Sequence, residues 1–320
     1  MQSQRHPKYM ELEGLRLTNE FSLENVRQAL RFVPETDDVI LATYPKCGTH
    51  WVQQIIQLIL NGGQSAANFF EFLKRTPLIE LLGTDILEGG PSPRFVKTHL
   101  PLARLHYKSD RAKYVYVARN PWDCCISFFY HTRMLPVLEY QDGTFDTFFE
   151  LFIGGKTDHG DFFDHVIPWY RRRNEPNILF LTYERLKEDP RETVSKLARF
   201  LGESHARFFE QRPDAIEDVL GMSSIAFMKE RFAFSPQKLH TVLHDDPDSV
   251  PDAMKRLLEK VFSSSREEGN SVNFIRKGTV GDWKGHFSRE QLDRMKVWIE
   301  EKTKEEPGIM VLWRGCGQGF

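Results

Sequence analysis

The sequence predicts a single α/β domain with a central parallel sheet flanked by helices. Four short runs rich in β-branched and aromatic residues are separated by segments of helix length, and such alternation is typical of parallel strands joined by helical crossovers. The predicted strands cover residues 38–43, 94–98, 113–119 and 177–184. The chain of 320 residues is 40% apolar, enough to bury one large core. We therefore expect residues 1–320 to form one domain, with its core at about 35–310.

The first predicted strand opens a P-loop-like strand–loop–helix unit, because the apolar run DDVILAT leads through a short loop into WVQQIIQLIL, which has helical periodicity. The periodic residues are Val52, Ile55, Ile56 and Ile59. A helix is predicted at 191–201, where Pro190 suits the first helical position. Another is predicted at 289–302, with Ser288 as N-cap. Residues 232–252, rich in Pro, Asp and Ser, are predicted to form a long loop or lid.

Composition argues against several classes of partner. The 43 basic and 45 acidic residues leave a net charge of −2, so no global field attracts nucleic acid or anionic lipid. The N-terminal segment lacks the apolar core of a signal peptide, and no window resembles a membrane span. We therefore expect a cytoplasmic protein. Neither CxxC nor His–Cys metal spacing occurs, so we expect free thiols and no metal site. The cysteines are Cys47, Cys124, Cys125 and Cys316.

The segment TYPKCGTHWVQQI, residues 43–55, has the features of an anion-binding loop. A helix that begins directly after a strand and a loop points its first backbone amides into that loop, and its dipole adds partial positive charge. Lys46 supplies a mobile cation, and Gly48 allows the backbone to approach a ligand closely. The segment does not match the Walker A pattern GxxxxGK[ST]. An ordinary strand-to-helix turn with a solvated lysine is the alternative interpretation.

Two further segments combine cations with positions that suit a phosphate. In YVYVARNPWDCCISFFYH, Arg119 ends a predicted strand, where parallel sheets bind ligands, and Ser127 lies on the following helix. A simple ion pair between Arg119 and Asp123 is the alternative. The third segment, FIRKGTVGDWKGHF, brings together Arg276, Lys277 and Gly278. Consecutive cations beside glycine indicate a phosphate clamp, although a solvated charged loop has the same composition.

His99, in FVKTHLPL, is the candidate general base. It follows a predicted strand directly, at the edge of the sheet where ligands bind. Its neighbours Leu100 and Pro101 provide an apolar setting that keeps an imidazole neutral and able to accept a proton. A structural histidine is the alternative, and His50 and His131 receive no catalytic role from the sequence.

Together, these segments resemble the cytosolic sulfotransferases, which transfer a sulfuryl group from 3′-phosphoadenosine 5′-phosphosulfate (PAPS) to a hydroxyl or amine of a small molecule. TYPKCGTHW resembles the family's 5′-phosphosulfate loop, YVYVARNPWDCCIS its 3′-phosphate segment and RKGTVGDWK its C-terminal 3′-phosphate loop. The resemblance spans most of the chain and implies that PAPS is the co-substrate. The donor-binding residues that it implies are Lys46, Cys47, Gly48, Thr49, His50, Trp51, Arg119, Ser127, Tyr183, Ser223, Arg276, Lys277 and Gly278.

The resemblance also implies four catalytic roles. His99 matches the family's base and would take the acceptor's proton as its oxygen attacks sulfur in line. Lys46 would stabilise charge on the leaving 3′-phosphoadenosine 5′-phosphate (PAP), and Lys97 would assist at the transferring group. Ser127 would hold Lys46 away from the donor until the acceptor binds. This chemistry needs cations at both ends of the donor and a base at the acceptor, with no metal obligatory.

Several positions depart from the family pattern. Cys47 and His50 stand where the family commonly has small hydroxyl residues, and Ile225 replaces an aromatic residue that usually packs on adenine. Because a helix N-terminus favours a thiolate, redox sensitivity of Cys47 is a hypothesis. The segment SREQLDRM lacks the dimer-contact pattern often found after the last loop, so we expect a monomer or a weak homodimer.

The acceptor is the least determined part of the predicted reaction. We expect a small phenol or a catecholamine-type amine, whose amine would pair with Glu139, Asp142 or Glu150; steroid and other alcohols stay open. One rival function is a Mg-dependent nucleotide phosphotransferase, which requires a carboxylate at a strand end. A non-catalytic nucleotide-binding module would not need His99. A Golgi-type carbohydrate sulfotransferase shares the donor loops but normally carries a membrane anchor.

Overall fold

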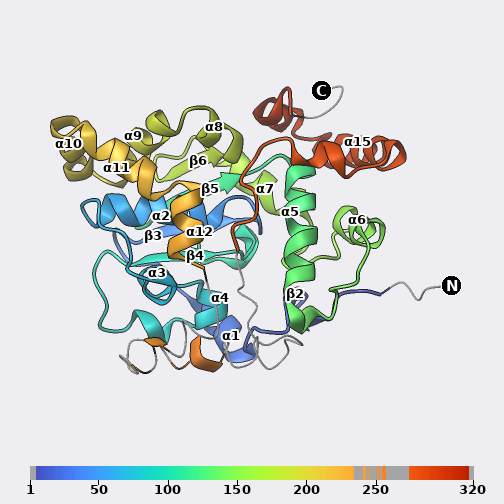
Figure 1. The fold of residues 1–320 in the computed structure, drawn as a ribbon, viewed down its shortest axis with the longest axis horizontal. Coiled ribbons are helices and arrows are strands. Elements are labelled where there is room, and N and C mark those ends of the chain that lie inside the picture. Colours follow the sequence, from blue (N-terminus) through green and yellow to red (C-terminus); the bar gives the residue numbers. More distant parts are fainter. Residues whose placement is uncertain are drawn as a thin grey trace.

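A four-stranded parallel sheet with the order β4–β3–β5–β6 forms the centre of the fold, as the sequence predicts (Figure 1). The computed structural model describes residues 5–233, 241–242, 244, 250, 252, 254–256 and 274–316. The strands are β1 (Tyr9–Leu12), β2 (Leu15–Thr18), β3 (Val39–Thr43), β4 (Phe95–Thr98), β5 (Lys113–Ala118) and β6 (Ile178–Thr182). The predicted lid at 232–252 lies largely outside the described residues.

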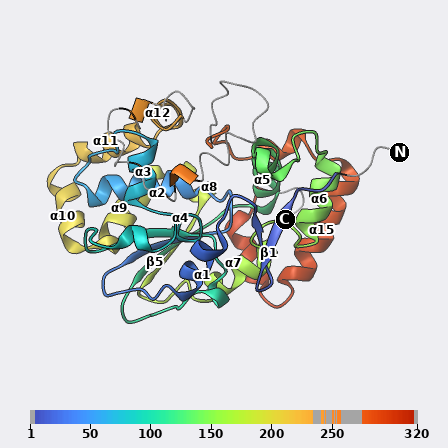
Figure 2. The same ribbon diagram turned by 90° about the horizontal axis from the view of Figure 1, so that it is seen from below.

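The helices cover both faces of the sheet. They are α1 (Leu23–Arg31), α2 (Thr49–Leu60), α3 (Phe69–Arg75), α4 (Ile79–Leu82), α5 (Pro121–Met134), α6 (Phe145–Ile153), α7 (Phe162–Arg171), α8 (Tyr183–Glu188), α9 (Pro190–Leu201), α10 (Glu203–Gln211), α11 (Asp214–Met222), α12 (Ile225–Arg231) and α15 (Arg289–Thr303). Figures 1 and 2 both show α9, α10 and α11 gathered on one side of the molecule and α5, α6 and α15 on the other.

Alternate residues of the strands enter two hydrophobic cores. Leu41 packs in a core with α2, α9 and α11, whereas Ile40 and Ala42 pack in the core that contains α5, α6, α7 and α15. All five residues of β3 are buried, because helices cover both faces of a parallel sheet. The two layers of helices therefore hold β3 rigidly at the centre, directly before the predicted anion-binding loop.

The chain order of the strands creates a crevice at one edge of the sheet. β4 and β5 lie on opposite sides of β3, so the connections that leave the carboxyl ends of these neighbouring strands diverge. In open α/β sheets, ligands bind in such crevices. The topology therefore places the loop after β3, His99 after β4 and Arg119 after β5 around one opening.

Most predicted element boundaries agree with the structure within two residues. α9 begins at Pro190, and α15 begins after Ser288, whose hydroxyl accepts a hydrogen bond from the Gln291 amide in a capping box. The predicted strand 177–184 is too long, because Thr182 ends β6 and caps α8 by accepting from the Arg185 amide. The antiparallel hairpin of β1 and β2 was not predicted, since its strands have only four residues each.

Candidate active site

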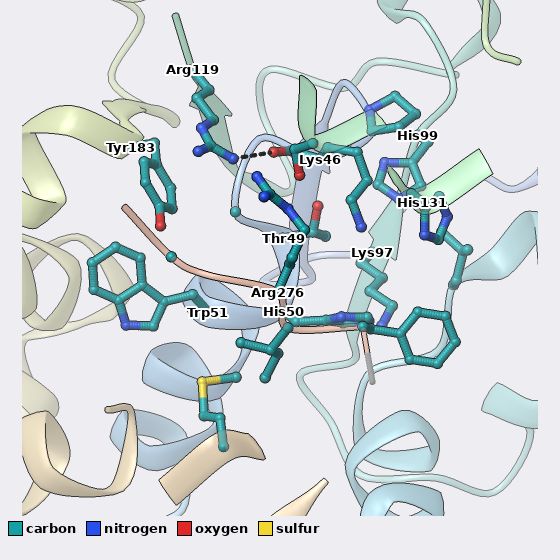
Figure 3. A pocket seen from close by; sticks show the side chains of 18 of the residues that line it. Lys46, Thr49, His50, Trp51, Lys97, His99, Arg119, His131, Tyr183 and Arg276 are labelled. Atoms are coloured by element: carbon teal, nitrogen blue, oxygen red, sulfur yellow. Dashed lines mark hydrogen bonds between the residues drawn. The ribbon is translucent and has the colours of Figure 1, made fainter. Parts of the chain in front are cut away.

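One cavity at the carboxyl edge of the sheet collects nearly all the predicted site residues. Figure 3 shows Trp51 and Tyr183 on one side of it and His99, His131 and Lys97 on the other, with Lys46 between them. The predicted residues that line the cavity are Lys46, Gly48, Thr49, His50, Trp51, Lys97, His99, Arg119, Ser127, Tyr183, Ser223, Arg276, Lys277 and Gly278. Cys47 is the exception. We call the Trp51 side the donor end and the His99 side the acceptor end.

The loop between β3 and α2 has a backbone that only a few residues could form. Lys46 and Gly48 both have positive φ angles, of 69° and 101°. A Cβ atom at Gly48 would lie 2.7 Å from Cδ2 of Tyr183, so a larger residue would collide with this ring. Gly48 also provides no side chain to cap α2, which leaves the first amides of the helix available to an anion.

Lys46 lies between the two ends of the cavity (Figure 3). Among the described residues its ammonium group makes no hydrogen bond or ion pair. Burial lowers the pKa of Lys46 to about 8, and the positive charges of Arg119 and Arg276 add to this effect. An anionic ligand beside the ammonium group would raise its pKa again by favouring the charged form. Lys46 is therefore suited to stabilise negative charge at the centre of the cavity.

Arg119 joins two of the predicted phosphate-binding loops. Its Nη1 donates to the carbonyl of Lys46 (3.3 Å), and its Nη2 donates to the carbonyl of Thr279 (3.0 Å). The guanidinium stacks on the ring of Tyr183, with its carbon 4.3 Å from the ring centroid. Its buried Nε has no hydrogen-bond partner. The arrangement holds the Arg119 cation at the donor end of the cavity and leaves its Nε–H available for a hydrogen bond to a ligand.

The ion pair of Arg119 with Asp123, which was the alternative interpretation, is present as well: Nη2 and Oδ2 are 3.9 Å apart and both side chains are buried. Asp123 also accepts hydrogen bonds from the backbone amides of Gly281 (2.7 Å) and Trp283 (3.1 Å). This carboxylate therefore fixes the C-terminal loop against α5, next to the loop after β3.

The C-terminal loop presents its cations together. Arg276 and Lys277 each contact Asp282, both at 2.7 Å, so one carboxylate orients both side chains. Gly278 has a φ of 66°, and a Cβ atom there would lie 2.1 Å from Cδ1 of Ile225. Ile225 thus packs at the donor end beside the backbone of the loop.

The side of the donor end that the resemblance assigns to adenine is aromatic. The rings of Trp51 and Tyr183 meet edge to face, 5.4 Å apart, and Nζ of Lys187 lies 4.3 Å from the centre of the Trp51 ring. Ser223 is buried nearby, with its hydroxyl 3.4 Å from the carbonyl of Leu220. Lys187 was not predicted, because nothing in LTYERLKEDP distinguishes it from a solvated lysine.

His99 is held in one tautomer. Its Nδ1 lies 2.8 Å from the carbonyl oxygen of Thr43, which can only accept a hydrogen bond, so Nδ1 carries the proton and Nε2 has the lone pair. Burial lowers the pKa of His99 to about 3, although the bond to Thr43 opposes this shift. The ring is therefore neutral at pH 7, in the state required of a general base.

Several buried polar groups lie around His99. Glu80 accepts a hydrogen bond from the backbone amide of His99, and burial raises the pKa of Glu80 to about 7. Lys97 donates from Nζ to Oε1 of Gln53 (2.6 Å), and burial lowers its pKa to about 7. His165 contacts the carbonyl of His99 through Nε2, at 3.1 Å. Glu80, Gln53 and His165 were not identified from the sequence, because they come from three separate helices, α4, α2 and α7.

The structure contradicts the thiolate hypothesis for Cys47 and shows where the ring of His50 packs. The Cys47 thiol is fully buried, 3.9 Å from the sulfur of Cys124, and burial raises its pKa well above the ordinary value. The hypothesis of a thiolate-prone Cys47 is therefore wrong. The ring of His50 packs on Phe72 and Phe274, at 5.8 and 5.7 Å, so it contributes to the acceptor end.

The carboxylates predicted to meet an amine lie elsewhere. Each forms a surface ion pair: Glu139 with Lys8, Asp142 with Arg5 and Glu150 with Arg294. The acidic residues that do line the cavity are Glu20 and Asp158. Glu20 and Asp158 were missed because their segments, TNEF and TDHG, match no motif and are separated in the sequence from the segments that predicted the site.

Among the residues that the structure describes, no helix is both long enough and apolar enough to cross a membrane. Among the same residues, no group of three or more His, Cys, Asp and Glu side chains is arranged to hold a metal ion.

Comparison with known proteins gives a consistent family assignment. Residues 36–307 match the model of the sulfotransferase domain. The chain is 34% identical over 301 residues to sulfotransferase 1B1 of Canis lupus familiaris, covering 91% of this chain and 90% of the relative. It is 36% identical over 282 residues to the amine sulfotransferase of Oryctolagus cuniculus, covering 87% and 84%.

A solved structure agrees with these relatives. The crystal structure of mouse sulfotransferase SULT7A1 complexed with PAP superposes with a TM-score of 0.70 at 26% identity, covering 96% of this chain and 98% of the mouse chain. Because the domain model matches most of the chain and close relatives cover nearly all of it, this protein belongs to the sulfotransferase family.

Proposed function

We propose that this protein transfers the sulfuryl group of PAPS to the hydroxyl of a small phenolic or catecholamine-type acceptor, with His99 as base. The observation that carries the proposal is that His99, with Nε2 unprotonated, lines the same cavity as the cations Lys46, Arg119 and Arg276. A base beside an anion cradle is the arrangement that sulfuryl transfer requires. The mouse structure complexed with PAP supports the choice of donor.

The residues of the donor end fit a nucleotide with phosphates at both positions. The amides of α2 and the Lys46 ammonium suit the 5′-phosphosulfate, and the Arg119 guanidinium with Arg276 and Lys277 suits the 3′-phosphate. Trp51 and Tyr183 offer aromatic surface for adenine. PAPS supplies an activated sulfuryl group whose leaving group is PAP.

In the proposed step, His99 Nε2 accepts the proton of the acceptor hydroxyl while its oxygen forms a bond to sulfur. The bond between sulfur and the bridging oxygen breaks at the same time, and its electron pair stays on PAP. Lys46 stabilises the charge on that oxygen, since burial makes its interaction with an anion strong. Lys97 lies on the acceptor side and assists at the transferring group. Ser127, on α5, lines the cavity and could position the Lys46 ammonium.

The test is transfer of labelled sulfate from PAPS to a panel of phenols, amines and steroids, with EDTA present, by wild type, His99→Ala and His106→Ala. We expect the His99 variant to lose at least about 100-fold in kcat while still binding PAP. His106 is exposed outside the cavity, so its variant should match wild type.

The remaining outcomes separate the rival functions. PAP binding without turnover of any acceptor would favour a binding module. Sulfate transfer that occurs only when EDTA is omitted would contradict a metal-free reaction, and full activity of His99→Ala would remove His99 as the base.

A further inference from the structure

We propose that Asp158, together with Glu20, binds a protonated amine on the acceptor, so that this sulfotransferase prefers phenols that carry an alkylammonium group. This inference rests on the proposed sulfuryl transfer, because it concerns which hydroxyl compound is presented to His99. It assigns the recognition of the amine to the two segments TNEF and TDHG, which the donor motifs do not include.

Asp158 lies in the cavity wall close to the proposed base. It belongs to the loop between α6 and α7, and its neighbour His159 places its ring centroid 5.4 Å from that of His99. Asp158 is only 5% exposed, and its Oδ1 has no hydrogen-bond partner. A buried carboxylate oxygen without a donor is costly unless a ligand provides one.

The loop that carries Asp158 is fixed in position. The Tyr44 hydroxyl donates to the carbonyl of Gly160 (3.0 Å) and lies 2.9 Å from the hydroxyl of Thr157. The backbone amide of His159 donates to the carbonyl of Arg16 (2.8 Å). Because these bonds hold the residues on both sides of Asp158, its carboxyl group is preorganised and need not be ordered when a ligand binds.

Most of the cations that line the cavity lie at the donor end. They are Arg119, Lys187, Arg276 and Lys277, whereas Lys46 lies between the two ends. At the acceptor end, Lys97 already donates to Gln53, and no lysine or arginine forms an ion pair with Asp158 among the described residues. Burial and, to a smaller extent, the nearby carboxylate of Glu20 together raise the pKa of Asp158 to about 7. A cation placed beside both carboxylates would favour their ionised forms.

The rest of the acceptor end suits an aromatic ring. The apolar side chains that line the cavity include Phe21, Phe69, Leu73, Leu81 and Phe274. Thr18 adds a buried hydroxyl, 3% exposed, whose oxygen has no hydrogen-bond partner and could accept from an ammonium group. An apolar wall for the ring, a base for the hydroxyl and carboxylates for the amine together describe an aryl-alkylamine acceptor.

Two acceptors of matched shape provide the test: tyramine, which carries an ammonium group, and 4-propylphenol, which replaces that group with a methyl. We would measure kcat/KM for both with wild type, Asp158→Asn and Glu20→Gln. Calorimetric binding of both compounds in the presence of PAP gives a readout that does not need turnover. Asp142→Asn, which changes an exposed carboxylate outside the cavity, is the matched control.

We expect wild type to favour tyramine. Asp158→Asn should lower kcat/KM for tyramine by at least about tenfold and that for 4-propylphenol by less than about threefold. Glu20→Gln should act in the same direction, and the control should change neither value. An equal loss for both compounds would indicate a structural role and overturn the proposal, as would an unchanged ratio. Turnover of neither compound, with neither binding beside PAP, would instead contradict the proposed function.

Discussion

The two ends of the cavity are built in different ways. The donor end is made by short loops that each contribute adjacent residues, such as Gly48 with Thr49 and Arg276 with Lys277, and it is strongly cationic. The acceptor end is assembled from single side chains on many elements, and its acidic members are Glu20 and Asp158. A fixed anion can be bound by backbone amides and local cations, whereas an acceptor of particular shape needs side chains from distant segments.

The largest expected difference concerns two lysines of the cavity, Lys46 at its centre and Lys187 at the donor end. Lys46→Met removes the cation at the centre of the cavity, so we expect kcat to fall by about 100-fold. Lys187→Met removes a cation stacked on Trp51, where a partly exposed contact is worth little, so we expect PAP to bind about threefold more weakly with kcat unchanged. Steady-state kinetics give kcat and calorimetry gives the affinity for PAP for each variant. Equal effects of the two substitutions on kcat would contradict a role of Lys46 in stabilising the leaving group.

A pair of glycine variants tests whether the loop backbone is as constrained as the geometry indicates. In Gly48→Ala, the new Cβ would meet Tyr183, so we expect PAP binding at least about tenfold weaker. Gly62→Ala is the control, because Gly62 also has a positive φ, of 59°, but no atom within 4 Å of the added Cβ. PAP affinity should then match wild type, with only a small loss of stability. Similar affinities for the two variants would contradict the proposed collision.

The smallest expected effect is that of pH on the stability of the fold, through His165 at the acceptor end. His165 contacts both the carbonyl of His99 (3.1 Å) and the hydroxyl of Tyr116 (2.8 Å), and burial lowers its pKa to about 4. The unfolded chain, with a histidine pKa of about 6.5, therefore binds more protons below pH 6.5. The stabilisation by the neutral ring is complete above that pH and is lost as pH falls toward 4.

We therefore expect the free energy of unfolding of wild type to fall by about 1 kcal/mol more than that of His165→Gln between pH 6.5 and 5.5. Urea unfolding of both proteins at each pH gives the comparison, in which the contributions of all other titrating groups cancel. Parallel pH profiles would show that His165 is not held neutral in the folded protein.

Much of the fold and the donor end could be predicted because the relevant signals are local. Apolar runs mark β3 to β6, and Gly48, Arg119 and Arg276 stand in short segments whose composition already suits an anion. The prediction failed where burial decides the chemistry. A helix N-terminus by itself favours a thiolate at Cys47, but complete desolvation reverses that preference.

The sequence by itself determined the parallel sheet, the strand–loop–helix unit, the cationic loops and His99 as a candidate base, since each depends on residues close together in the chain. Only the tertiary structure decided the tautomer of His99, which Thr43 sets, and the acidic residues of the cavity. Glu139 and Asp158 are equally acidic in the sequence; one forms an ion pair on the surface and the other is buried beside the acceptor end. The reason is physical: the ionisation and reach of a side chain depend on solvent and neighbours, which long-range packing brings together.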